Sequence, residues 1–550
     1  MNRKLIFLFA LLVATPLFAD TQRYMIATKK APARTGLRVV SNSADAAKHR
    51  VRTFANINAF SADLTAEEAA ALRASGEVDS VEPAVLRHAL ELSPAPFKAE
   101  ANIGLKYQTQ ITPWGLPIVH AKDVWAVSKG QNVNVAVLDT GIDLQHPDLI
   151  HAYAGGYNVY APAEPPQDDN KHGTHVSGII AAADNAFGTV GIAPGVKLWA
   201  VKVLNIRGEG YDDEIVAGLD WVISKAKQSG GRWVINMSIG SRARSEVEAR
   251  AIYEALENGI VVIAAAGNRD RDILDYPGRY QAVLAVGALD NAGNKADFSS
   301  YGIGLSVMAP GVDVPSTVIE GVNESADVQI GNTGYNAWGI TGSPYATVTG
   351  PIVDCGLGYP QDFPASVAGK VALVKRGEIK FRDKARNAKD AGAAAIIIYN
   401  NDDTTSTNWN MDFMTCKDAV CEYDPGWENY QFILSIGVTG VDGEKLKALA
   451  NPTATAAFRS EKYAELSGTS MATPHVTAIA ALLLSLNPTL TPSDVRWALE
   501  STAQDKLEPG WDMQTGWGVA DAFAAAKHVA PQKFGLPQQQ QPPRRQSVRH

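Results

Sequence analysis

The chain has 550 residues and a mass of 58.7 kDa, which exceeds what one hydrophobic core usually serves, so about two to four folded units are expected. Its 46% hydrophobic and 20% charged residues are typical of a soluble globular protein and exclude a disordered chain or a polytopic membrane protein. A formal net charge of -8 argues against a dedicated nucleic-acid binder, and three cysteines exclude a small protein held together by many disulfides.

The two ends of the chain differ in composition from the rest. Residues 1–19 hold two basic side chains followed by an apolar run from Leu5. This pattern is typical of a signal peptide, since the run is shorter than the ~20 apolar residues of a membrane-spanning helix; a membrane anchor is the alternative. Cleavage near Ala19 predicts a secreted mature protein without a membrane segment. Residues 531–550 are rich in Pro and Gln and are expected to form a disordered tail.

Residues 20–107 hold predicted strands, one helix and a linker. A strand is predicted at 54–60, where apolar residues alternate. An amphipathic helix is predicted from Thr65, whose hydroxyl can form a capping box with Glu68. This order of elements predicts a small α+β unit. The linker that follows, from Glu91, has no clear period and is expected to be open to cleavage.

From Gln110 short apolar runs alternate with helical ones. Alternation of this kind predicts a parallel sheet with helices on both faces, and ligands of such sheets bind beyond the carboxyl ends of the strands. The polar residues at those predicted strand ends are Asp139, Ser238, Gly240 and Asn268.

Four motifs in this part of the chain and near its end resemble those of the subtilisin family of serine proteases. They are DTGID at 139–143, HGTHVSG at 172–178, AAAGN at 264–268 and GTSMATPH at 468–475. The motifs stand in the order found in the family. The resemblance implies a subtilisin-like catalytic domain in two parts, residues 108–316 and 464–530, with serine endopeptidase activity through an acyl-enzyme.

The chemistry can be assigned to particular residues. A serine nucleophile needs a base within hydrogen-bond distance, and a buried carboxylate orients that base; Ser470, His172 and Asp139 can fill these roles. Ser470 opens an apolar helix, so its backbone N–H can stabilise an oxyanion. Asn268 is suited to donate its side-chain amide to the same oxyanion. By the family pattern, His175 is structural.

The resemblance also implies where substrates and calcium bind. In the family the peptide is added as a strand between two segments. The matching substrate-binding residues are Gly208, Gly210, Ser238, Ile239, Gly240, Ala265, Ala266 and Gly267. Asp275 aligns with the floor of the primary specificity pocket, where it would favour Lys or Arg unless Arg269 or Arg271 neutralises it.

Calcium is the implied cofactor, and oxygen ligands suit this ion. The matching ligands are the side chains of Gln110, Asp148 and Asn185 and the carbonyls of Ala183, Phe187 and Thr189. An ordinary polar loop is the alternative at this position.

Residues 317–463 interrupt the catalytic pattern and hold all three cysteines. Within them, 367–402 resembles the protease-associated domain, which implies an inserted β-rich α/β unit that acts either as a stabilising lid or as a substrate gate or protein-binding face. Cys416 and Cys421 flank a short loop and are expected to pair, which leaves Cys355 free or competing.

The N-terminal unit resembles the inhibitory propeptide of these proteases, a ferredoxin-like α+β fold, with self-processing between Glu91 and Gln108. The expected partners are protein and peptide substrates and the propeptide itself, with no nucleic acid, and a monomer is expected.

A serine esterase of the α/β-hydrolase type is disfavoured because GTSMA lacks the G-x-S-x-G elbow. A catalytically silent binding module is disfavoured because all the catalytic residues are present together.

Overall fold

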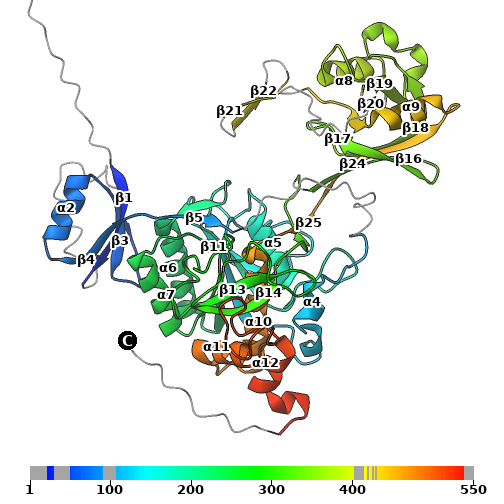
Figure 1. Cartoon of the computed structure of the whole chain (residues 1–550). Helices are drawn as coiled ribbons and strands as arrows, with labels where there is room; N and C mark the ends of the chain where they lie inside the picture. Colours follow the sequence, from blue (N-terminus) through cyan, green and yellow to red (C-terminus); the bar gives the residue numbers. More distant parts are fainter. Residues whose placement is uncertain are drawn as a thin grey trace, which may run out of the picture.

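The computed structural model describes residues 21–29, 50–90, 107–321, 323–401, 414–417, 420–423, 427 and 430–537. Within them the chain forms an N-terminal unit, a central unit with a seven-stranded sheet, and an inserted barrel (Figure 1). The predicted signal peptide, the predicted linker and most of the predicted tail lie outside the described residues.

The central unit is built on a parallel sheet, as the alternation of strands and helices predicts. Its strands lie in the order β14-β13-β12-β10-β6-β8-β7, and each neighbouring pair is parallel. They are β6 (Val133–Asp139), β7 (Tyr153–Asn158), β8 (Lys197–Lys202), β10 (Arg232–Met237), β12 (Val261–Ala265), β13 (Leu284–Leu289) and β14 (Leu305–Pro310). Asp139, Ser238 and Asn268 therefore lie at one edge, where β6, β10 and β12 end.

Helices cover both faces of this sheet. One face carries α4 (Gly115–Ile118), the 3-10 helix η2 (Lys122–Val124), α5 (His172–Ala181), α10 (Thr469–Leu486), α11 (Pro492–Ser501) and α12 (Ala522–Val529). The other face carries α6 (Asp212–Ser229) and α7 (Glu246–Glu257). Among the described residues, α10 alone has the length and mean hydropathy (1.4) to cross a membrane, and 94% of it is buried inside the fold. It is the core helix of the first face.

The N-terminal unit is an antiparallel sheet with one helix. Its elements are β1 (Gln22–Thr28), β2 (Arg52–Thr53), β3 (Ala59–Leu64), α2 (Ala66–Ala74) and β4 (Val78–Pro83), with the strands in the order β2-β3-β1-β4. The capping box is confirmed, because the N–H of Glu68 donates to the Thr65 hydroxyl (3.2 Å) and the N–H of Thr65 donates to the Glu68 carboxylate (2.9 Å). This sheet lies beside α6 and α7 (Figure 1).

The strand predicted at 54–60 is wrong in its first part, since β3 begins only at Ala59. The N–H groups of Ala55 and Asn56 donate instead to the carboxylate of Asp220 in α6, at 2.9 and 2.7 Å. This segment follows the surface of the central unit rather than a neighbouring strand, and the alternation of apolar residues could not distinguish the two.

A three-stranded antiparallel sheet joins the N-terminal unit to the central unit. It contains β5 (Leu86–Ala89), β9 (Glu209–Tyr211) and β11 (Ile239–Gly240), in the order β11-β5-β9. The end of the N-terminal unit is thus the middle strand between two segments of the central unit.

The inserted unit is a closed barrel with two helices outside it. The barrel strands are β16 (Asn323–Ile330), β17 (Thr333–Gly339), β18 (Ala346–Asp354), β19 (Val371–Lys375), β20 (Ala395–Tyr399), β23 (Leu434–Val438) and β24 (Thr453–Glu461). The other elements are η3 (Pro360–Asp362), η4 (Ala365–Val367), α8 (Phe381–Asp390), α9 (Gly440–Ala448) and the hairpin β21 (Met414–Lys417) with β22 (Val420–Tyr423). The antiparallel pair β15 (Val314–Thr317) and β25 (Tyr463–Leu466) carries the chain into and out of the barrel (Figure 1).

The predicted start of the disordered tail, at residue 531, is too early in the chain. Residues Pro531–Phe534 form the 3-10 helix η5, in which Pro531 is buried. The ring of Phe534 packs edge-on against Phe523 of α12, with 5.5 Å between ring centroids. The packing of Phe534 extends the folded part of the chain past α12. The high Pro and Gln content of the segment had predicted disorder instead.

Candidate active site

The site begins with a buried carboxylate–imidazole pair. Asp139 ends β6 and His172 is the first residue of α5, and both side chains are fully buried. Oδ1 of Asp139 lies 2.7 Å from Nδ1 of His172 and accepts the N–H of Thr140 at 2.7 Å. Because Nδ1 faces the carboxylate, Nε2 is the ring nitrogen that can exchange a proton with another group.

His175, one turn along α5, has a different environment. Its Nε2 lies 3.1 Å from the carbonyl oxygen of Ala464 in β25, and burial lowers the pKa of the ring to about 3. The imidazole is therefore neutral at ordinary pH and ties α5 to β25.

Ser470 lies in the first turn of α10. Its hydroxyl donates to the carbonyl oxygen of Ser238 (2.8 Å), and the Ser238 hydroxyl donates to the carbonyl of Ser470 (2.9 Å). A hydroxyl has one hydrogen to donate. The expected bond from Ser470 to His172 therefore requires the hydroxyl to turn away from Ser238, whose carbonyl was not expected as its partner.

Two N–H donors converge on the carbonyl oxygen of Leu90, at the end of the N-terminal unit. Nδ2 of Asn268 donates to this oxygen at 2.7 Å, and the backbone N–H of Ser470 donates at 3.3 Å. The Oδ1 atom of Asn268 accepts the N–H and the hydroxyl of Thr469 at 2.9 and 2.8 Å. Thr469 fixes which way the amide faces. Sequence reasoning missed this role, although Thr469 directly precedes the predicted nucleophile.

The residues before Leu90 lie in the site as an added strand. The N–H of Leu90 donates to the carbonyl of Ser238 (3.2 Å), and the N–H of Ala89 donates to that of Gly208 (2.8 Å). In the sheet registers, Gly240 faces His88 and Ile239 faces Ala89 on one side, while Gly210 faces Arg87 on the other. The two segments predicted to bind substrate, 208–210 and 238–240, thus lie on either side of residues 87–90.

A pocket of small residues surrounds the Leu90 side chain. A Cβ on Gly240 would lie 2.6 Å from Cδ1 of Leu90, so only glycine leaves room for this side chain. Asp275 lies next to Gly240 and Gly267. A Cβ on Gly240 would lie 3.2 Å from Cβ of Asp275, and a Cβ on Gly267 would lie 2.9 Å from Oδ2 of Asp275. Ala265 and Ala266 are fully buried at the end of β12.

Asp275 is 3% exposed and lies near several arginines, of which Arg269 forms an ion pair with it. Burial raises its pKa, and the nearby Arg269 opposes that shift, with Nε 3.9 Å from Oδ2. The proton-bound form of the carboxyl is thus favoured relative to an exposed aspartate.

The predicted calcium ligands form one polar cluster. The carboxylate of Asp148 accepts Nδ2 of Asn185 (2.7 Å), the N–H of Thr189 (3.1 Å) and the hydroxyl of Tyr463 (3.0 Å). Nε2 of Gln110 donates to the carbonyl of Ala183 (2.8 Å). The remaining residue, Phe187, donates its N–H to Oδ1 of Asn185 (2.9 Å).

The donor set of this cluster fits a hard cation. Among the described residues, no group of three or more His, Cys, Asp or Glu side chains could hold a metal ion. Asp148 is the one carboxylate of the cluster, and the other ligands would be amide and carbonyl oxygens, which suit Ca²⁺. Rotating the side-chain amides of Gln110 and Asn185 by about 180° would direct their oxygens, in place of their nitrogens, toward a bound cation.

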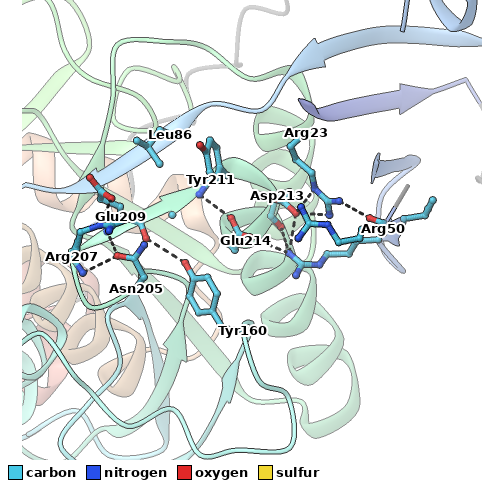
Figure 2. A pocket seen from close by; sticks show the side chains of 13 residues that line it. Arg23, Arg50, Leu86, Tyr160, Asn205, Arg207, Glu209, Tyr211, Asp213 and Glu214 are labelled. Carbon is cyan, nitrogen blue, oxygen red and sulfur yellow. Dashed lines mark hydrogen bonds and ion pairs between the residues drawn. The ribbon is translucent and has the colours of Figure 1, made fainter. Parts of the chain in front are cut away.

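Charged groups hold the N-terminal unit against the start of α6. Arg23 donates to the carboxylate of Asp213 at 2.8 Å and Arg52 does so at 3.1 Å. Figure 2 shows Arg23 directed toward Asp213 from the N-terminal unit. Burial and the neighbouring Asp213 raise the pKa of Glu214 to about 8. The acidic first turn of α6 thus meets an arginine cluster.

The cysteines lie only in the inserted unit. Cys355 is a buried free thiol, and burial raises its pKa to about 12. Cys416 and Cys421 face each other in the register of the β21–β22 hairpin.

Comparisons with known families and proteins place all three units in known families. The model of the subtilase family matches residues 130–347 and 423–518, the PA domain matches 348–446, and the peptidase inhibitor I9 matches 21–89. Subtilisin DY of Bacillus licheniformis is 44% identical over 213 residues, which cover 38% of this chain and 75% of that protein.

Two further relatives extend the comparison. An alkaline protease of Alkalihalobacillus alcalophilus is 43% identical over 235 residues, 42% of this chain and 58% of that protein, so the match spans little more than half of the relative. The crystal structure of a psychrophilic subtilisin-like protease from the Antarctic Pseudoalteromonas sp. AS-11 is 30% identical, with a TM-score of 0.50, and the alignment covers 78% of this chain and 100% of that one.

Proposed function

Because the chain belongs to the subtilase family, whose model matches more than half of its residues, we propose that it is a secreted, calcium-dependent serine endopeptidase made as a self-processed precursor. One observation carries this proposal. The carbonyl oxygen of Leu90 accepts from Asn268 and from the N–H of Ser470, and Asp139, which is hydrogen-bonded to His172, ends β6 at the same edge of the sheet. A peptide carbonyl held by two N–H donors at a nucleophile occupies the position of the bond to be cut.

The proposed mechanism follows from these contacts. Ser470 Oγ turns from Ser238 and attacks the carbonyl carbon while Nε2 of His172 accepts its proton, and Asp139 stabilises the imidazolium that forms. The oxyanion accepts hydrogen bonds from Asn268 and from the Ser470 N–H. His172 then gives its proton to the leaving amine, which departs and leaves an acyl-enzyme on Ser470. Water, activated by His172, hydrolyses the ester and restores the site.

The first substrate in this proposal is the chain itself. Leu90 supplies the acyl side, so the bond to be cut is Leu90–Glu91, at the start of the segment 91–107 where cleavage was expected. After cleavage, residues 21–90 remain bound as an inhibitor through β5, the arginine cluster and the apolar contacts of β1 and β3 with α6 and α7. The boundary of the propeptide would thus be Leu90.

A digest of casein by the purified protein tests the proposal. We expect a mature chain that begins at Glu91, caseinolytic activity that a serine-directed inhibitor abolishes, and new peptide termini that follow Leu and other apolar residues. The apolar preference follows from the Leu90 pocket and from the raised pKa of Asp275. Intact casein under all conditions would contradict the proposed activity.

The same digest decides the role of Asp275. An apolar preference that Asp275→Ser leaves unchanged would exclude recognition of Lys or Arg at this pocket. A preference for Lys or Arg that Asp275→Ser abolishes would restore that role and overturn the apolar assignment.

We propose calcium at the cluster around Asp148, where it would hold the segment 183–189 against the N-terminal end of the mature chain through Gln110. Bound calcium supplies charge to neutralise Asp148 and takes no part in peptide hydrolysis. A site filled at 100 times its dissociation constant adds about 2.7 kcal/mol to the free energy of unfolding.

Chelation is therefore expected to lower the melting temperature of the mature protein by several degrees. Thermal melts in calcium and in excess EDTA measure this shift. Asp148→Ala should melt early in both buffers, whereas Asp297→Ala, at an exposed position, should keep the full response. Identical melting temperatures of the wild type with and without chelator would contradict the proposed calcium site.

The remaining assignments complete the proposal. Residues 1–19 would direct export, the mature protein would act as a monomer on protein substrates, and Cys416 would form a disulfide with Cys421. The facing positions of these two cysteines in the hairpin support that pairing. The strands β15 and β25, which bound the barrel, support the limits near 316 and 464 between the catalytic unit and the inserted unit.

A further inference from the structure

The bound segment of the N-terminal unit carries one side chain that the reaction does not use. Arg87 lies three residues before Leu90, and its side chain is fully buried, as is that of Glu248 in α7. Nη2 of Arg87 donates to Oε2 of Glu248 at 2.5 Å, and Nε donates to Oε1 at 3.1 Å. Two parallel N–H bonds to both carboxylate oxygens are the fork geometry specific to arginine.

The rest of the guanidinium is also satisfied by the central unit. Nη1 of Arg87 donates to the hydroxyl of Ser241 (2.9 Å) and to the carbonyl of Ala243 (2.7 Å). The hydroxyl of Tyr280, also in the central unit, has one hydrogen to share between the carbonyl of Ser245 (2.7 Å) and Oε2 of Glu248 (2.9 Å). All the groups that accept hydrogen bonds from the Arg87 guanidinium thus belong to the central unit. Arg87 itself belongs to the N-terminal unit, which departs after cleavage.

Departure of the N-terminal unit would open this pocket and leave the Glu248 carboxylate without its ion-pair partner. Within the described part of the chain, Arg87 is the only cation paired with Glu248. An uncompensated buried charge is strongly unfavourable. A peptide that places a guanidinium at the same position restores the pair, whereas an apolar side chain there would bury the carboxylate unpaired.

We propose that Glu248, Ser241 and the Ala243 carbonyl form an arginine subsite that selects peptides with Arg three residues before the residue on the acyl side of the scissile bond. This inference rests on the proposed endopeptidase function and names the substrate class of that site. The preferred substrates are sequences of the type Arg-x-x-Leu, as in the Arg87–Leu90 segment. Lysine is a weaker substitute because its ammonium cannot form the fork.

Quenched fluorescent peptides with the sequence VLRHALELS, residues 85–93, test the subsite with the mature enzyme. Arg, Lys, Gln or Met is placed at the position of Arg87. We expect kcat/KM to be at least about 30-fold higher for Arg than for Gln or Met, the ratio that corresponds to losing one partner of a buried charge pair. Lys is expected to fall between them.

Glu248→Gln should reduce the Arg-to-Gln ratio to within about threefold, because the neutral amide no longer demands a cation. Glu257→Gln is the matched control: it makes the same change on an exposed residue of α7 and should keep the ratio. If Glu248→Gln does not fold, the wild-type peptide series alone decides. Equal cleavage of all four peptides by the wild type overturns the subsite but leaves the endopeptidase function standing, whereas cleavage of none of them, together with intact casein, is the failure of that function.

Discussion

Replacing Ser470 by alanine is expected to lower peptide turnover by about 10⁶-fold and to leave the precursor uncut at Leu90–Glu91. In subtilisin, a relative of this chain, loss of the nucleophile lowers kcat by about 2 × 10⁶. The residual rate comes from the oxyanion donors, and here Asn268 and the Ser470 N–H remain in place. Mass spectrometry of the purified protein and kcat on a quenched peptide measure the two effects.

Ser501→Ala provides the control, because it removes a hydroxyl from an exposed position at the end of α11. It should be processed and active like the wild type. A double variant, Ser470→Ala with His172→Ala, should be no slower than either single variant, since the two residues act as a unit. Normal processing of Ser470→Ala would show that another protease makes the cut, and normal turnover would reject the assigned nucleophile.

Asn268→Ala is expected to lower kcat by about 10²–10³-fold, the loss measured for the equivalent donor in subtilisin. Its Nδ2 lies 2.7 Å from the Leu90 carbonyl oxygen and would stabilise the negative charge that develops there. KM should change little, because the backbone bonds along β9 and β11 hold the peptide without this amide. Initial-rate kinetics on one quenched peptide separate kcat from KM.

Asn332→Ala is a suitable control, since Asn332 is exposed in the turn between β16 and β17 of the barrel. A loss that appeared in KM alone would assign Asn268 to ground-state binding and not to the oxyanion. Full activity of Asn268→Ala would leave the Ser470 N–H as the only donor to the oxyanion.

Polar contacts add to the apolar packing between the N-terminal unit and the central unit. The last residues of the N-terminal unit occupy the substrate position, its arginines meet the first turn of α6, and Glu82 accepts the N–H of Glu246 (3.0 Å) at the start of α7. A carboxylate at a helix start satisfies an amide that has no partner inside the helix and complements the helix dipole. In the proposed precursor, the same surface that binds the unit as an inhibitor would also hold the Leu90–Glu91 bond at Ser470.

Local patterns were sufficient for much of the fold. The alternation of apolar runs predicted the parallel sheet and the helices on its faces, and Thr65 and Glu68 predicted the start of α2. The strand predicted at 54–60 failed because Ala55 and Asn56 bond to Asp220, which is more than 160 residues away in the chain. The tail boundary failed because the packing of Phe534 on Phe523 cannot be recognised from composition.

The sequence by itself predicted the proposed chemistry, because the residues proposed as nucleophile, base, carboxylate and oxyanion amide each lie in a short motif and the four motifs occur together in one order. The tertiary structure alone decided which groups face one another across the chain. It set the Ser470 hydroxyl against the Ser238 carbonyl, Thr469 against Asn268, and Arg87 against Glu248. These contacts join residues on separate strands, helices and units, so their energy depends on burial and direction, which no local pattern of residues encodes.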